Sequence, residues 1–172
     1  MKILIDVDNI IGNLCDAVLS VYNEDSGDNL CSENITSYYI ENFVKPQYKD
    51  NFKGAKAVNS AIWYFLNNAT KEDIRKLVNK LYELPPVEKI NFNETCQGTI
   101  PICFSILLES NSFEEAMRKA VWVGGDTDTI CAIVGSMVES LFGIPEEIEE
   151  KMWEYLDEDM KNIIRDFEWR TR

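Results

Sequence analysis

The 172-residue chain has no histidine, and its 17 lysines and arginines are outnumbered by 30 aspartates and glutamates. The absence of histidine excludes Ser-His-Asp and Cys-His catalysis, and it excludes zinc or haem held by imidazole. The net charge of −13 is unfavourable for wrapping a nucleic acid, which requires a basic face. We therefore expect no nucleic-acid partner, although helix N-termini, backbone amides or a bound cation can still hold an anionic nucleotide.

Long apolar runs are also missing, and the cysteines follow no recognisable pattern. No stretch approaches the roughly 20 apolar residues that span a bilayer, and no signal-peptide pattern follows Met1. The five cysteines are odd in number and none has C-x-x-C spacing, which is typical of reduced thiols packed as small apolar side chains. These features predict a cytoplasmic protein with no membrane partner.

The spacing of apolar residues predicts an all-α helical bundle with one short N-terminal β-strand. Residues 2–7 (KILIDV) are rich in β-branched side chains and predict a buried strand. Helical spacing begins at Ile10 and, after a polar stretch with a proline at 44–52, continues nearly to the end. We place a boundary there, between a strand-helix segment at 1–51 and a helical region at 52–172, which together form one compact unit.

Local signals mark several helix ends. Thr70 with Asp73, and Ser112 with Glu115, have the spacing of capping boxes. The first of these predicts a helix through Leu81 that ends before the prolines at 85–86. A turn is predicted at 95–101, leading into a helix through Leu108, and Gly124-Gly125 predicts a helix break. The last apolar face is predicted from Trp153, Tyr155, Leu156, Ile163, Ile164 and Phe167.

The most distinctive local feature is GGDTDT at 124–129, between two predicted helices. Asp126 and Asp128 at i and i+2, with interleaved hydroxyls, place several hard oxygen atoms close together. Mg²⁺ prefers such ligands, and a shared cation relieves the repulsion between neighbouring carboxylates. A second interpretation is that Asp126 is an ordinary helix N-cap and that Thr127 and Asp128 lie on a solvated turn.

Residues 52–167 resemble the C-terminal half of the ADP-ribosylglycohydrolase family, which includes the dinitrogenase-reductase-activating glycohydrolase. The similar passages are GAKAVNSAIWYFL (54–66), FNETCQGTIPICFSILLES (92–110) and SFEEAMRKAVWVGGDTDTICAIVGSMVESLFGIPEEI (112–148). The resemblance implies an all-α bundle that holds two Mg²⁺ ions and cleaves the glycosidic bond of ADP-ribose. It implies metal ligation by Asp126, Asp128 and Thr129, and ligand contacts from Gln97, Gly98, Thr99, Gly124, Gly125 and Thr127.

The chain also departs from this family. It has no Thr-Asp-Asp motif, no Gly-Asp-x-x-Gly motif and no adjacent pair of aspartates, and these motifs bring the remaining metal ligands in the family. Three ligands predict a weak or incomplete Mg²⁺ site. We therefore expect the chain to bind an ADP-ribose-type nucleotide, including a cyclic signalling derivative, without efficient hydrolysis. For the 97–99 segment, a plain helix-entry turn before Pro101 is an equally good interpretation.

Residues 2–44 resemble the opening of the 5′-nucleotidase branch of the haloacid-dehalogenase-like hydrolases. The resemblance implies that Asp6 is a phosphate-accepting nucleophile and that Asp8 is its acid/base partner. The later lysine and acidic motifs of that fold are not recognisable. Asp6 and Asp8 are alternatively a relic, accessory carboxylates beside Asp126 and Asp128, or solvated residues at the end of a strand.

Two rival functions therefore remain. One is an active Mg²⁺-dependent glycohydrolase completed by Asp6 and Asp8 or by a second subunit, and the other is a nucleotidase-type phosphatase. Half of a family core is expected to leave apolar helix faces uncovered, so we expect a homodimer. Alternatively, the N-terminal segment covers that face within one chain.

Overall fold

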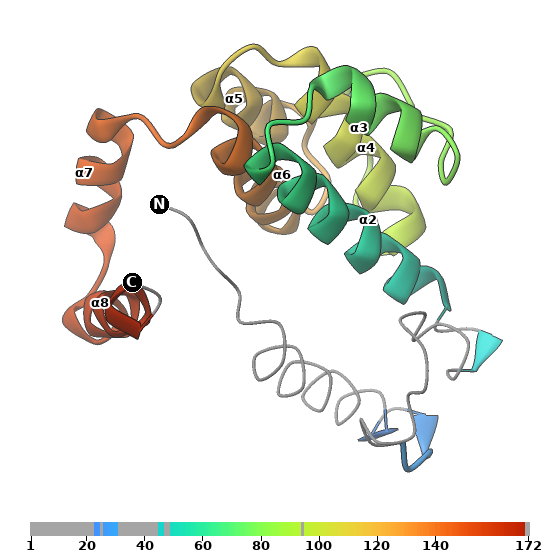
Figure 1. Ribbon diagram of the computed structural model, residues 1–172, viewed down its shortest axis with the longest axis horizontal. Helices are drawn as coiled ribbons and strands as arrows, with labels where there is room; N and C mark the ends of the chain where they lie inside the picture. The colour runs from blue at the N-terminus through green and yellow to red at the C-terminus, as the bar shows by residue number, and fades with distance from the viewer. Residues whose placement is uncertain (1–22, 25, 31–44, 47–48, 94, 171–172) are drawn as a thin grey trace. The chain divides into compact units, whose positions relative to one another are not determined.

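The computed structural model describes residues 23–24, 26–30, 45–46, 49–93 and 95–170 (Figure 1). Within these residues all seven elements are helices, so the all-α class predicted from the sequence is confirmed. The strand predicted at 2–7, with Asp6 and Asp8, lies outside the described residues, as does most of the predicted N-terminal helical segment. No helix in the described part of the chain is long and apolar enough to cross a membrane.

The helices are α2 (Lys49–Leu66), α3 (Lys71–Val78), α4 (Cys96–Glu109), α5 (Phe113–Val123), α6 (Thr127–Phe142), α7 (Glu146–Tyr155) and α8 (Glu158–Arg170). Contacts divide the chain into two units, residues 50–154 and residues 1–49 with 155–172. In the second unit the side-chain amide of Asn23 forms hydrogen bonds with both the backbone N–H and the carbonyl of Leu30. Lys45 forms a 3.0 Å ion pair with Asp28.

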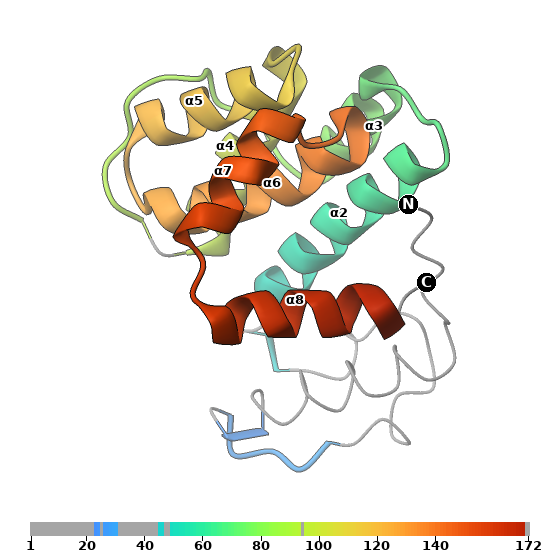
Figure 2. The same ribbon diagram turned by 90° about the vertical axis from the view of Figure 1, so that its left-hand side faces the viewer.

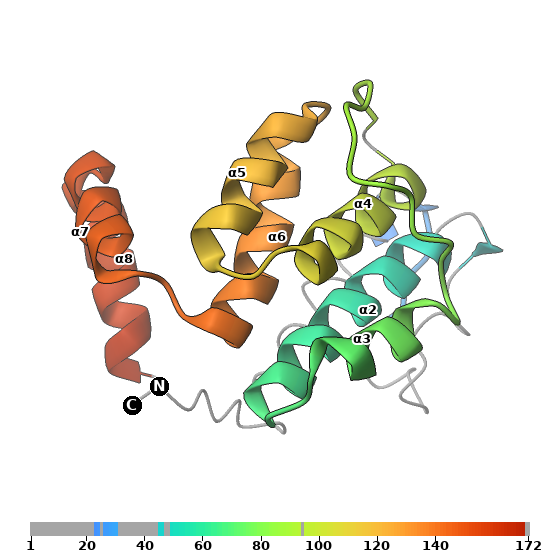
Figure 3. The same cartoon turned by 90° about the horizontal axis from the view of Figure 1, so that it is seen from above.

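The unit at 50–154 is built around α4. Every residue from Thr99 to Leu108 is buried, so α4 is enclosed on all sides rather than on one stripe. Figure 3 shows α4 between the α2–α3 pair and the α5–α6 pair. Helices α5 and α6 form a hairpin whose turn is Gly124–Asp126 (Figure 2). The buried side chains of all five helices form one apolar core.

Two predicted capping boxes differ in their outcome. At Thr70 the box is complete, because the Thr70 hydroxyl accepts from Asp73 N–H while the Asp73 carboxylate accepts from Thr70 N–H. At Ser112 the hydroxyl accepts from Glu115 N–H at 3.1 Å, as expected. The Glu115 carboxylate, however, accepts from the N–H of Asn111 at 2.8 Å. In the second box the carboxylate therefore bonds to the residue before the N-cap instead of to the N-cap residue itself.

Two boundary predictions were wrong. Helix α3 ends at Val78. The backbone N–H groups of Leu81 and Tyr82 both donate to the Val78 carbonyl in the turn that follows. The stretch 95–101 is not a turn: α4 begins at Cys96, since the Thr95 hydroxyl caps Gly98 N–H, and Pro101 lies inside the helix.

The last apolar face is interrupted as well. It divides into α7 and α8, because Asp157 caps a new helix by accepting from Met160 N–H at 2.8 Å. Tyr155 and Ile163, which were expected to pack, are 80% and 69% exposed.

Candidate functional site

The loop that joins α5 to α6 depends on two glycines. Gly124 ends α5 with φ 78°, and Gly125 follows with φ 69°. Both values lie in the left-handed region, which glycine adopts without a steric penalty. The helix break predicted here is therefore confirmed, and the chain reverses so that Asp126, Thr127, Asp128 and Thr129 start α6.

Asp126 occupies the N-cap position of α6 but does not cap the helix with its side chain. Its backbone carbonyl accepts from Ile130 N–H at 2.9 Å, whereas its carboxyl group forms a hydrogen bond with that of Asp128. Thr70, Thr95 and Ser112, by contrast, all use their hydroxyls as caps. The N-cap interpretation is thus right for the backbone of Asp126, while its side chain belongs to a carboxyl pair.

The carboxyl pair holds charge at the N-terminus of α6. The hydrogen bond from Asp126 lowers the pKa of Asp128, and backbone N–H groups of Thr129 and Asp128 lower it further. These amides are the positive end of the α6 dipole, which favours the carboxylate form. Two neighbouring carboxylates repel each other, and a bound cation would relieve that repulsion.

A segment far from the loop in the sequence packs against it. Ile90 N–H donates to Val123 O at 2.9 Å, and Ile90 pairs with Gly124 in an isolated parallel bridge. A β-carbon on Gly125 would lie 3.0 Å from the Ile90 side chain and 3.3 Å from Asn91 O. The segment 90–93 is therefore part of the site, which sequence reasoning missed. Its only local signal is a β-branched residue in a polar stretch before a helix.

The residues at 97–99 lie in the first turn of α4, where two of their predicted ligand contacts already have partners. Gly98 N–H donates to the Thr95 hydroxyl at 3.2 Å. Thr99 is buried, and its hydroxyl donates to Asn93 O at 3.0 Å. Gln97 is exposed. These contacts belong to the first turn of α4, and a pyrophosphate contact at 97–99 stays a prediction.

The metal set predicted from Asp126, Asp128 and Thr129 also stays a prediction. In the part of the chain that the structure describes, no group of three or more Cys, Asp or Glu side chains is arranged to hold an ion. Two carboxylates and a threonine hydroxyl nevertheless fit Mg²⁺, which is commonly held by one or two carboxylates together with substrate phosphates and water.

Two cysteines lie in the core helices α4 and α6. Burial in α4 raises the pKa of Cys103 to about 12, and the nearby Cys131 of α6 contributes to the shift. Burial, and then the charge of Asp128, raise the pKa of Cys131. Both thiols are therefore held in the protonated form, which is a poor nucleophile and a poor metal ligand.

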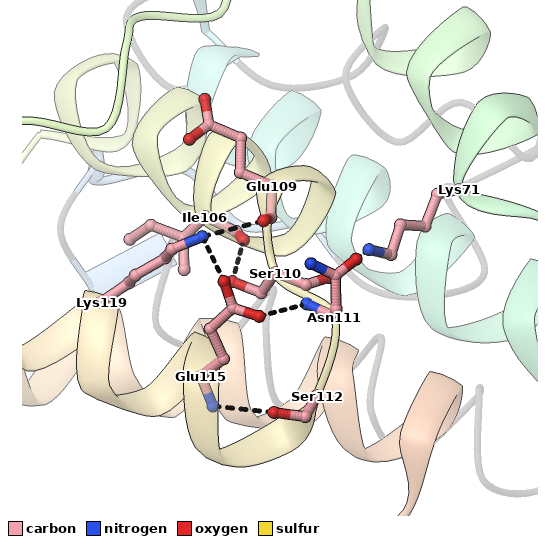
Figure 4. A network of polar contacts seen from close by, with 8 residues as sticks. All are labelled: Lys71, Ile106, Glu109, Ser110, Asn111, Ser112, Glu115 and Lys119. Atoms are coloured by element: carbon pink, nitrogen blue, oxygen red, sulfur yellow. Dashed lines mark hydrogen bonds and ion pairs between the residues drawn. The ribbon is translucent and has the colours of Figure 1, made fainter.

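A second polar cluster surrounds the other end of α4 (Figure 4). Lys71 of α3 donates to Ser110 O, and Lys119 of α5 donates to Glu109 O at 2.8 Å. Lys119 also pairs with Glu115 at 2.9 Å. Cations at a helix C-terminus satisfy carbonyls that lack helical partners. This cluster ties three helices together, and we assign it to stability.

The family model described as ADP-ribosylglycohydrolase matches residues 44–171, so the chain belongs to the ADP-ribosylglycohydrolase family. A second model, described as 5′ nucleotidase, deoxy (Pyrimidine), cytosolic type C protein, matches residues 1–83. Both resemblances stated from the sequence are thus confirmed, and they indicate a hydrolase-related or nucleotide-related function.

The chain is also similar to an uncharacterized protein of Archaeoglobus fulgidus. The two are 37% identical over 75 residues, which cover 42% of this chain and 25% of that protein. The chain therefore spans about a quarter of the length of this relative. No solved structure matches the chain.

Proposed function

We propose that the chain binds an ADP-ribose-type nucleotide, including cyclic derivatives, at the loop 124–129 and does not hydrolyse it efficiently. The observation that carries this proposal is that Asp126 and Asp128 lie together at the N-terminus of α6, where the Asp126 side chain does not cap the helix. The pair is too small to enclose a divalent ion. It is well suited to share one with the phosphates of a nucleotide, which is how Mg²⁺ commonly binds in proteins.

Weak hydrolysis follows from the same shortage of ligands. Cleavage at an anomeric carbon by paired metals requires both ions to be positioned so that water is activated and charge is stabilised. Two carboxylates and one hydroxyl hold at most one ion, which keeps most of its water. Binding does not suffer equally, because nucleotide affinity comes from base stacking and phosphate contacts as well as from the metal.

Calorimetric titration with ADP-ribose, with and without Mg²⁺, tests the proposal. We expect Mg²⁺-dependent binding that the double substitution Asp126→Asn, Asp128→Asn abolishes. The matched control is Asp159→Asn, because Asp159 is likewise an exposed aspartate in the first turn of a helix. Absence of ADP-ribose binding to the unmodified chain with Mg²⁺ would overturn the proposal.

Recovery of the ligand distinguishes binding from turnover. After incubation with excess Mg²⁺ and heat release, chromatography should return cyclic ADP-ribose unchanged, and an ADP-ribosylated protein should keep its modification. Steady release of ADP-ribose that Asp128→Asn abolishes would instead show an active glycohydrolase. In that case Asp6, Asp8 or a second subunit supplies the missing ligands.

The match of residues 1–83 to a 5′-nucleotidase model supports one rival. A nucleotidase-type phosphatase would release inorganic phosphate from nucleoside monophosphates and lose that activity on Asp6→Asn. Phosphate release that is unaffected by Asp126→Asn would favour this rival over the proposal.

We further propose that the chain is a homodimer, as expected for half of a family core. Several large apolar side chains are exposed on α7 and α8, namely Met152, Tyr155, Met160, Ile163 and Trp169. Light scattering at micromolar concentration should give twice the 19.8 kDa chain mass. A monomeric mass would contradict the dimer. It would also exclude a second subunit as the source of missing metal ligands in an active glycohydrolase.

A further inference from the structure

One aromatic side chain beside the loop is exposed although its backbone neighbours are firmly held. Phe92 is 66% exposed, and it follows Ile90 by two residues. The parallel bridge of Ile90 with Gly124 sets the register of this segment along the loop. Asn91 O would lie 3.3 Å from a β-carbon on Gly125, so Phe92 directly follows the residue that contacts the loop.

The segment that carries Phe92 is attached on both sides. Before it, Ile90 N–H donates to Val123 O at 2.9 Å. After it, Asn93 Oδ1 accepts from the backbone N–H of Thr95 at 2.9 Å and from the Thr95 hydroxyl at 2.7 Å. Asn93 O also accepts from the buried Thr99 hydroxyl at 3.0 Å. Phe92 therefore projects from a short backbone segment with a fixed start and a fixed end.

Glycine at position 98 permits this second attachment. A β-carbon on Gly98 would lie 2.2 Å from the side-chain nitrogen of Asn93, so only glycine lets Asn93 pack there. The two attachment points belong to the first turn of α4 and to the end of α5. Phe92 thus stands between the two segments that the sequence singled out for ligand contacts, 97–99 and 124–129.

An exposed aromatic ring on a fixed backbone segment suits a planar base. Stacking on such a ring is worth about 1–3 kcal/mol per base, and a fixed backbone lowers the cost of ordering the ring. Trp122 is the other exposed aromatic beside the loop, at 51%. The ammonium group of Lys89 lies 5.1 Å from the centre of its ring, so that face of the indole already has a partner.

We propose that Phe92 is the residue on which the base of the bound nucleotide stacks. The inference rests on the proposed function and identifies its specificity-determining contact. Phosphates then lie toward Asp126 and Asp128 through a shared cation, and the base lies against the ring of Phe92.

Affinity measurements with two ligands and four variants test the inference. For ADP-ribose with Mg²⁺, Phe92→Ala should weaken binding about 5- to 150-fold, the range that corresponds to loss of one stacked base. Ribose 5-phosphate, which has no base, should bind Phe92→Ala and the unmodified chain equally. Trp122→Ala is the matched control and should leave both affinities unchanged. Phe92→Trp should retain ADP-ribose affinity, whereas Phe92→Leu, which stays apolar but not aromatic, should lose it.

The outcomes separate this inference from the proposed function. If the unmodified chain does not bind ADP-ribose, the proposed function fails. If it binds and Phe92→Ala binds equally well, the site stands and the stacking role of Phe92 is wrong. Equal losses for ADP-ribose and ribose 5-phosphate would also overturn stacking, because they would show a general disturbance of the loop. If Phe92→Ala melts at a lower temperature, Phe92→Trp and Phe92→Leu are compared instead. Equal ADP-ribose affinity of these two variants would likewise overturn stacking.

Discussion

Ile90 packs so closely on Gly125 that a β-carbon there would lie 3.0 Å from two atoms of the Ile90 side chain. Gly125 also has φ 69°, so it meets two requirements that only glycine satisfies. This contact joins the segment before α4 to the loop after α5, next to Asp126.

The first prediction concerns this pair. Gly125→Ala should destabilise the fold by about 1–3 kcal/mol, from left-handed backbone strain and from the contact with Ile90. In the double substitution with Ile90→Ala the contact is relieved and the strain remains. Denaturant unfolding of the two single variants and the double variant should therefore show a favourable coupling of roughly 1 kcal/mol. Strictly additive effects would mean that backbone strain alone explains the glycine.

The thiol of Cys103 provides a second prediction. Its pKa is raised to about 12 by burial, so the protonated thiol is the form that the fold stabilises. This stability is fully present below the pKa of the unfolded thiol, near 8.5, and it is lost as the pH rises from there toward 12. Iodoacetamide at pH 8.5 should label the partly exposed Cys131 before Cys103. Peptide mapping should find Cys103 modified only at the denaturant concentrations that unfold the protein.

A third prediction uses the cluster at the end of α4. Lys71 donates to the carbonyl of the buried Ser110, and its ammonium group lies 5.4 Å from the centre of the Phe142 ring. Lys71→Met keeps the length of the side chain and removes the donor, which should lower the free energy of unfolding by about 1 kcal/mol. Lys76→Met changes an exposed lysine on the same helix and should have little effect. Equal melting temperatures for the two variants would contradict a stabilising role for Lys71.

The loss of stability at acidic pH gives a fourth prediction. The Lys119 ammonium and the Asn111 N–H lower the pKa of Glu115 below its usual 4.5. A carboxylate with a lowered pKa contributes stability above that usual value and loses it as the pH falls through the lower folded pKa. Glu115→Gln should therefore make stability less dependent on pH between about 5 and 3. Glu150→Gln, at an exposed position on α7, should leave the wild-type slope unchanged.

The features that the sequence predicts well are those decided by neighbours in the chain. The left-handed glycines at 124–125 and the capping box at Thr70 depend on backbone geometry within a few residues, so local residue types suffice. The N-cap position of Asp126 was likewise among the two interpretations. The side chain of Asp126 interacts with Asp128 instead of capping the helix. The interpretation as a metal site had already grouped these two carboxylates.

Features that depend on packing could not be predicted in the same way. Ile90 reaches Gly124 across 34 positions, and no periodicity links the two. Glu115 bonds to Asn111 rather than Ser112, and the other oxygen of its carboxylate pairs with Lys119. The predicted turn at 95–101 failed because Gly and Pro usually mark turns, whereas here they lie in a helix that neighbouring helices enclose.

The enclosure of α4 has a consequence for motion. Because ten consecutive residues of α4 are buried, its amide protons can exchange with solvent only when the surrounding helices separate. The first turn of α6, where Asp128 and Thr129 are exposed, can open without that event. The candidate site is thus attached to an enclosed helix, while Asp128 lies on an exposed first turn. A ligand can reorder the rim of the site without disturbing the helix on which it is built.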